Sequence, residues 1–73
     1  MVDTEKLENL IQSSGYKKTF IAQKLGISSV SLWKKANNMT KFTGVEINEL
    51  CKLLDVTSIK QQREIFFTEE YTK

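Results

Sequence analysis

Residues 18–37 decide the fold, and they read KTFIAQKLGISSVSLWKKAN. Apolar residues recur at helical spacing on both sides of Gly26, and there is no proline in the chain. We therefore expect a short helix from about Lys18 to Leu25. It should end at Gly26, because glycine adopts the left-handed turn that other residues adopt only at a cost. Three residues of this helix should face inward, namely Ile21, Ala22 and Leu25.

A second short helix should follow directly. Ser28 can cap its start, and the helix should run to about Ala36 with Leu32 and Ala36 facing inward. Ala22 is small enough to let the two helices approach each other. Two short helices separated by three residues around a glycine are typical of the helix-turn-helix unit.

The flanking segments are also helical by pattern. A first helix should start at an Asp3 or Thr4 cap and end near Gly15. Its apolar face would be Leu7, Leu10 and Ile11. Residues 37–41, Asn-Asn-Met-Thr-Lys, have the composition of a loop.

The fourth helix has a strong start signal. Thr43 and Glu46 match a capping box, and Phe42 and Ile47 match a hydrophobic staple around it. The helix should run to Leu54. Its inward residues would be Ile47, Leu50, Cys51 and Leu54.

A weaker capping box at Ser58–Gln61 predicts a fifth helix or turn through about Phe66. The tail, residues 68–73, could be frayed or extended. Apolar residues of the C-terminal region would close the core of a monomer or form a homodimer interface, and these are Ile59, Ile65, Phe66, Phe67 and Tyr71. The fold class that follows is all-α, a compact single domain of four to five helices over residues 1–73, with the helix-turn-helix at about 18–37.

Composition limits the possible functions. The chain of 73 residues has one cysteine and no histidine, so we expect no disulfide, no metal site and no cofactor. Without histidine or a glycine-rich phosphate loop, we also expect no enzyme activity. No run of about 20 apolar residues is present to span a membrane. The N-terminus is acidic and polar, unlike a secretory signal, so a cytoplasmic location in the cell is expected.

Charge is concentrated in one stretch. The modest net charge of +2 hides six lysines and no acid between Lys17 and Lys41, while residues 1–16 and 42–73 each sum to −2. A concentrated basic patch draws a polyanion to one face of a small protein. The alternative is a solvated lysine face, which is common in small domains.

The chain resembles the lambda-repressor and Cro-like helix-turn-helix regulators. The resemblance is carried by YKKTFIAQKLGIS at 16–28, FTGVEINELCKLL at 42–54 and EIFF at 64–67, and it covers about residues 5–67. Small Cro-like proteins of temperate phages of Gram-positive bacteria are similar. They include antirepressors of the modulator-of-repression type, which act opposite a lysogeny repressor.

The resemblance implies that the helix after Gly26 reads operator DNA in the major groove of the double helix. Candidate residues facing the bases are then Ser28, Ser29, Val30, Trp33 and Lys34. Candidate phosphate contacts are Lys17, Lys18, Asn37 and Lys41. The family usually has Gln where Lys18 stands, and Thr or Ser where Lys17 stands, which predicts a weaker cap on that helix.

The largest departure from the family is the apolar pair Val30 and Trp33, where Arg, Gln or Asn is usual. Val30 could meet a thymine methyl, and Trp33 could instead be a partly buried residue at the edge of the core. An exposed pair, with Phe20 adjacent, would be an apolar patch that suits a protein partner.

Two functions therefore stay open from the sequence. The first is a regulator that binds operator DNA, and the second is an antirepressor that binds the cognate phage repressor through Val30 and Trp33. One face can serve both. An antitoxin or a purely structural helical domain is a third and weaker reading, because antitoxins usually carry a longer extension than the six residues after Phe67.

Overall fold

The computed structural model describes residues 1–68, and it has five α-helices and no strand within them. They are α1 (Thr4–Ser14), α2 (Lys18–Leu25), α3 (Ser29–Ala36), α4 (Gly44–Leu53) and α5 (Ile59–Phe66). The expected all-α fold is therefore confirmed. The predictions for Tyr71 and the rest of the tail after Thr68 lie outside the described residues.

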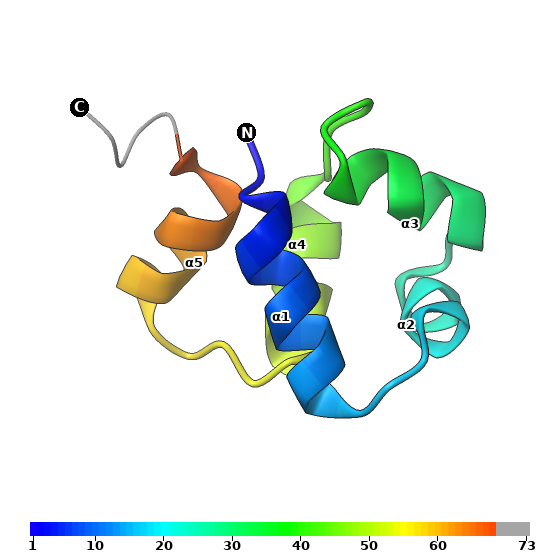
Figure 1. Cartoon of the computed structure of the whole chain (residues 1–73), viewed down its shortest axis with the longest axis horizontal. Helices are drawn as coiled ribbons and strands as arrows, with labels where there is room; N and C mark the ends of the chain where they lie inside the picture. Colours follow the sequence, from blue (N-terminus) through cyan, green and yellow to red (C-terminus); the bar gives the residue numbers. More distant parts are fainter. Residues whose placement is uncertain (69–73) are drawn as a thin grey trace.

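The helices are arranged along an elongated body whose principal extents are 34 × 24 × 21 Å. Helices α1 and α4 occupy the middle, α2 and α3 form one end, and α5 packs against α1 at the opposite end (Figure 1). Most of the lysine-rich window lies on α2 and α3 and therefore at one end of the molecule, whereas Lys41 lies in the loop after α3.

The helix ends follow the sequence signals closely. Asp3 caps α1, and Gly15 ends it in the left-handed conformation with φ of 78°. At the start of α4 both bonds of the capping box are present, from the Glu46 N–H to the Thr43 hydroxyl (3.2 Å) and from the Thr43 N–H to the Glu46 carboxylate (2.9 Å). Helix α4 ends at Leu53, one residue earlier than expected.

The second expected capping box is only half formed. The Ser58 hydroxyl accepts a hydrogen bond from the Gln61 N–H at 3.3 Å, but within residues 1–68 no return bond from the Gln61 side chain is seen. This single bond is sufficient to start α5 at Ile59, because the serine satisfies one of the unpaired amides of the first turn.

The core is wholly apolar among the described residues and draws on all five helices. Its buried members are Leu7, Ile11, Ile21, Ala22, Leu32, Ala36, Ile47, Leu50, Cys51, Leu54, Val56, Ile65 and Phe66. Leu10 and Leu25, which were expected to face inward, are half-buried at its edge. Ile65 and Phe66 close the core of the monomer, whereas Ile59 stays 69% exposed.

The N-terminal segment, residues 1–4, joins α3 to α5. Its backbone bonds the end of α5, through the Asp3 N–H to the Ile65 carbonyl at 2.7 Å and the Thr68 N–H to the Met1 carbonyl at 3.1 Å. On its other side the Thr4 hydroxyl donates to the Ala36 carbonyl at 2.6 Å. The end of α3 is thus held by hydrogen bonds from a segment far away in the sequence.

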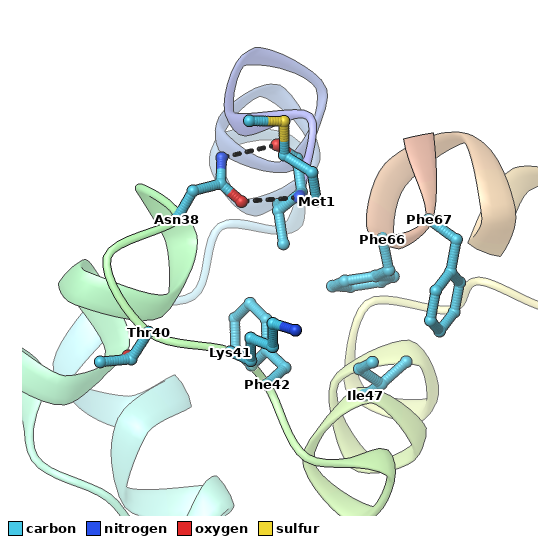
Figure 2. A pocket seen from close by; sticks show the side chains of 9 residues that line it. Met1, Asn38, Thr40, Lys41, Phe42, Ile47, Phe66 and Phe67 are labelled. Carbon is cyan, nitrogen blue, oxygen red and sulfur yellow. Dashed lines mark hydrogen bonds between the residues drawn. The ribbon is translucent and has the colours of Figure 1, made fainter. Parts of the chain in front are cut away.

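A groove of about 380 Å³ opens beside this segment (Figure 2). Its lining combines apolar side chains with Asn38, Thr40 and Lys41 from the loop after α3. The apolar part consists of Met1, Val2, Phe42, Ile47, Phe66 and Phe67. None of the five helices described is long and apolar enough to cross a membrane.

Candidate nucleic-acid interface

The turn between α2 and α3 has the geometry that the sequence predicts. Gly26 takes φ of 73° and ψ of 26°, and its N–H bonds the carbonyls of Ala22 and Gln23. The Ser28 hydroxyl then accepts from the Ser31 N–H at 3.0 Å and starts α3. Lys17 gives α2 no side-chain cap, in agreement with the weak cap that the sequence predicts.

The outward face of α3 carries two exposed apolar side chains. Val30 is 63% exposed and Trp33 is 54% exposed, while Leu32 and Ala36 face the core. Trp33 also lines a small crevice with Lys18, Ser29 and Glu8, so it borders the core without being buried in it. Three of the predicted site residues, Lys18, Ser29 and Trp33, are thereby brought together.

Several predicted polar contacts are already used within the protein. The Asn37 amide donates to the Trp33 carbonyl at 2.9 Å and so caps the end of α3. The Ser28 hydroxyl is occupied by the Ser31 amide. The Lys18 amine lies 2.9 Å from the Glu8 carboxylate of α1. On this face of α3, Ser29 and Lys34 are the exposed polar residues with no such bond within residues 1–68.

The basic window loses part of its charge to acids from outside it. Lys35 pairs with Glu46 of α4, and both side chains are largely buried. Burial raises the pKa of the Glu46 carboxyl, but the hydrogen bonds from Lys35 and Thr43 and the charge of Lys35 outweigh it, so the pKa is lowered. Four lysines of the window form no ion pair within residues 1–68, namely Lys17, Lys24, Lys34 and Lys41.

Lys41 lies apart from the crevice at Trp33. It lies in the loop after α3 and lines the groove beside Met1 and Phe66 (Figure 2). Its predicted role as a phosphate contact stays a prediction, and it would involve a different part of the surface from Lys17 and Lys34.

Phe20 has a partner that the sequence did not suggest. Its ring stacks on Tyr16, with 5.1 Å between ring centroids, and the Lys24 amine lies 5.4 Å from the same ring. No ring contact links Phe20 to Trp33 within the described residues. Phe20 and Lys24 stand one helical turn apart on the outside of α2, and Tyr16, which precedes the helix, joins them in a cluster separate from Trp33.

Cysteine and acidic side chains are the other groups that could carry chemistry. Cys51 is buried in the core, and burial raises the pKa of its thiol. Across residues 1–68 no group of three or more acidic or cysteine side chains is close enough to hold a metal ion.

Sequence reasoning missed the internal partners of the lysines. Glu46 was recognised as a capping residue, but its bond to Lys35 depends on how α3 crosses α4. Likewise, Glu8 and Lys18 stand ten residues apart on different helices. Asn37 at the end of α3 could have been recognised as a cap, because asparagine often bonds nearby backbone groups.

Comparison with known proteins identifies no relative. The chain matches no protein-family model, and neither curated proteins nor solved structures give a significant match. Function is therefore inferred from the residues and contacts described above.

Proposed function

We propose that this protein is a transcriptional regulator that binds operator DNA through its helix-turn-helix, as regulators of phage lysis–lysogeny switches do. The observation that supports this most is the position of Lys34 on the exposed face of α3, with Lys17 preceding α2 at the same end of the molecule. The sequence between Lys17 and Lys41 contains no acidic residue, and Glu8, which lines the crevice at Trp33, is paired with Lys18.

The physical basis is the fit of an α-helix into the major groove. Phosphate contacts from lysines set the register, and the exposed face of the helix then contacts the base edges. Helix α3 suits this because its inward side chains are buried and its outward ones are free of the core. Lys17 is assigned to a phosphate. Lys34, a base-facing candidate from the sequence, is reassigned to a phosphate, because its point charge forms no paired bonds with a base edge. Ser29, Val30 and Trp33 are assigned to bases.

The test is the salt dependence of binding. DNA affinity would be measured between about 50 and 200 mM salt for the wild type, Lys34→Ala and Lys60→Ala. Lys60 is a matched control, because it is an exposed lysine on α5 at the other end. Loss of one phosphate contact should reduce the salt slope by about 1 in Lys34→Ala alone. Equal slopes in all three proteins would refute the assignment.

Operators of this kind are usually two-fold symmetric, so we also propose that the protein binds DNA as a homodimer. Since Ile65 and Phe66 are buried in the monomer, the apolar surface left in this region is Ile59 on α5 and the half-buried Phe67 at its C-cap. Sedimentation with and without DNA tests this, and a single protomer bound to each operator would contradict it.

A second function is favoured by the exposed apolar pair on α3. Val30 and Trp33 stand where polar residues usually read bases, and a charge-rimmed apolar patch with a tryptophan is typical of a protein contact. We propose as the alternative an antirepressor that binds the cognate phage repressor.

Fluorescence separates the two functions, since Trp33 is the single tryptophan. It would be titrated with operator-region DNA and, separately, with the repressor's DNA-binding domain. A change with DNA that is lost at raised salt supports the regulator. A change with the repressor that persists at raised salt, together with loss of the complex in Trp33→Ala by calorimetry, supports the antirepressor.

A further inference from the structure

We infer that α3 selects its DNA by apolar contact with thymine methyl groups, made by Val30 and Trp33, rather than by paired hydrogen bonds to purines. This inference rests on the proposed function as a DNA-binding regulator. It goes further, because it names the chemical feature of the base pairs that the helix recognises.

The first step is the loss of polar readers on this helix. Paired hydrogen bonds to guanine or adenine need Arg, Asn or Gln side chains with free donors and acceptors. The amide of Asn37 is bonded to the Trp33 carbonyl at 2.9 Å, and the Ser28 hydroxyl is bonded to the Ser31 N–H at 3.0 Å. Each bond uses one site of the side chain and turns that side chain toward the backbone of α3, so neither presents its full set of donors and acceptors to a purine edge.

The two polar side chains that stay available discriminate poorly. Ser29 has a hydroxyl that suits either kind of base, and Lys34 carries a point charge without the fixed fork of arginine. Lys34 therefore stabilises the complex through the phosphates or a purine acceptor, but it does not impose a pair of directional bonds. Sequence preference has to come from another pair of residues on this face.

Val30 and Trp33 are that pair. They lie three residues apart on one side of α3 and are 63% and 54% exposed, whereas the core side of the helix is filled by Leu32 and Ala36. Neither side chain belongs to the buried core, although Trp33 borders it. In water this pair leaves apolar surface exposed, and a partner that covers it gains the free energy of burial.

The major groove offers one apolar group at the base edges, the 5-methyl of thymine. A helix that brings a valine and an indole ring into that groove would bury these methyl groups. Charge favours DNA as the partner, since Lys17 and Lys34 form no ion pair within residues 1–68, and Glu8, the acid that lines the crevice at Trp33, is paired with Lys18. A polyanion is favoured over an apolar protein surface for that reason.

The experiment removes the methyl groups and nothing else. Duplexes with a random 20-base-pair core would be selected on the wild-type protein at low salt, and the enriched duplex resynthesised with deoxyuridine in place of thymidine. Each methyl buried against the helix should contribute about threefold to fourfold in affinity. We expect enrichment of thymine at fixed positions, and weaker binding of the deoxyuridine duplex by at least that factor.

Variants assign the effect to its residue. In Val30→Ala the difference in affinity between the thymidine duplex and the deoxyuridine duplex should shrink, because the thymine methyl loses its partner. Val45→Ala is the matched control, since Val45 is 74% exposed on α4 and lies outside α3. It should keep the full difference. Circular dichroism confirms that both variants stay folded, as expected for exposed side chains.

The possible outcomes distinguish failure of thymine-methyl recognition from failure of DNA binding itself. If binding depends on salt but both duplexes bind equally, or if no thymine is enriched, recognition by methyl groups is wrong while DNA binding stands. If no salt-dependent binding occurs, the proposed function fails and this inference fails with it. If Trp33 fluorescence then responds to the repressor domain, the apolar pair serves a protein contact.

Discussion

The Lys35 amine and the Glu46 carboxylate form an ion pair that joins α3 to the first turn of α4. The same carboxylate accepts a hydrogen bond from the Thr43 N–H at 2.9 Å, so it also closes the start of α4. The side chains are only 14% and 12% exposed, respectively. One acidic residue thus both caps a helix and holds the candidate reading helix on the core.

Glu46 should make stability depend on pH in the acidic range. Its pKa in the folded protein is lowered, so its contribution is complete above the ordinary carboxyl pKa of 4.5 and is lost as pH falls through the folded value. Glu46→Gln should lower the free energy of unfolding at pH 7 by about 1–3 kcal/mol. It should also lose less stability between pH 6 and pH 3 than the wild type does, measured by urea denaturation.

Glu49→Gln is the control for this change. Glu49 lies on the same helix, but its side chain is 50% exposed and its distance to the Lys52 amine is 4.0 Å. The free energy of unfolding of Glu49→Gln should differ from that of the wild type by less than about 0.5 kcal/mol. An equal acid sensitivity in Glu46→Gln and in Glu49→Gln would show that the pair with Lys35 is not the cause.

Gly26 and Gly44 should respond in opposite ways to alanine. A Cβ would meet no atom within 4 Å at either position, so packing does not distinguish them. Gly26 has φ of 73°, and Gly26→Ala should destabilise the protein by about 1 kcal/mol or more. Gly44 begins α4 without a positive φ, and Gly44→Ala should stabilise it by about 0.4–1 kcal/mol. Thermal denaturation of the two variants tests the sign of each change.

Local signals account for how well the helices could be predicted. Helix caps and helix-end glycines act within four residues, so they can be predicted from a short stretch of sequence. The caps at Asp3, Ser28 and Thr43 are examples. The bounds of α2, Lys18–Leu25, agree with the expectation at both ends. The start of α5 could also be predicted, although Ser58 forms only half of the expected capping box.

The candidate site was less predictable because its charges are paired across helices. Counting lysines gave a block of six, but Lys18 and Lys35 bond carboxylates contributed by α1 and α4. Such pairs depend on crossing angles that no local pattern contains. The exposure of Val30 and Trp33 could be predicted from the sequence, since Leu32 and Ala36 already filled the inward positions of α3.

Cys51 should be unreactive in the folded protein. It is 6% exposed, and burial raises the pKa of its thiol, so the reactive thiolate is scarce and shielded. Labelling with a disulfide reagent at pH 8 should be slow in buffer and rise steeply as urea unfolds the protein. Fast labelling in buffer would place this end of α4 in an open, locally unfolded state.

Asn38 should hold the N-terminal segment against the end of α3. Its side chain accepts from the Val2 N–H at 2.7 Å and donates to the Val2 carbonyl at 2.9 Å (Figure 2). Its φ of 64° suits glycine, so Asn38→Gly removes both bonds without straining the backbone. We expect a loss of about 1–2 kcal/mol in the free energy of unfolding and faster exchange of the Val2 amide proton by NMR.

Asp55→Gly separates this role from a general effect of glycine. Asp55 is the other non-glycine residue with positive φ among residues 1–68, at 61°, and its side chain makes no hydrogen bond or ion pair seen there. Its change to glycine should therefore leave stability within about 0.5 kcal/mol. If the two variants lose stability equally, chain entropy explains the result. If Asn38→Gly alone also weakens DNA binding while the salt slope is unchanged, the segment positions α3 without touching the phosphates.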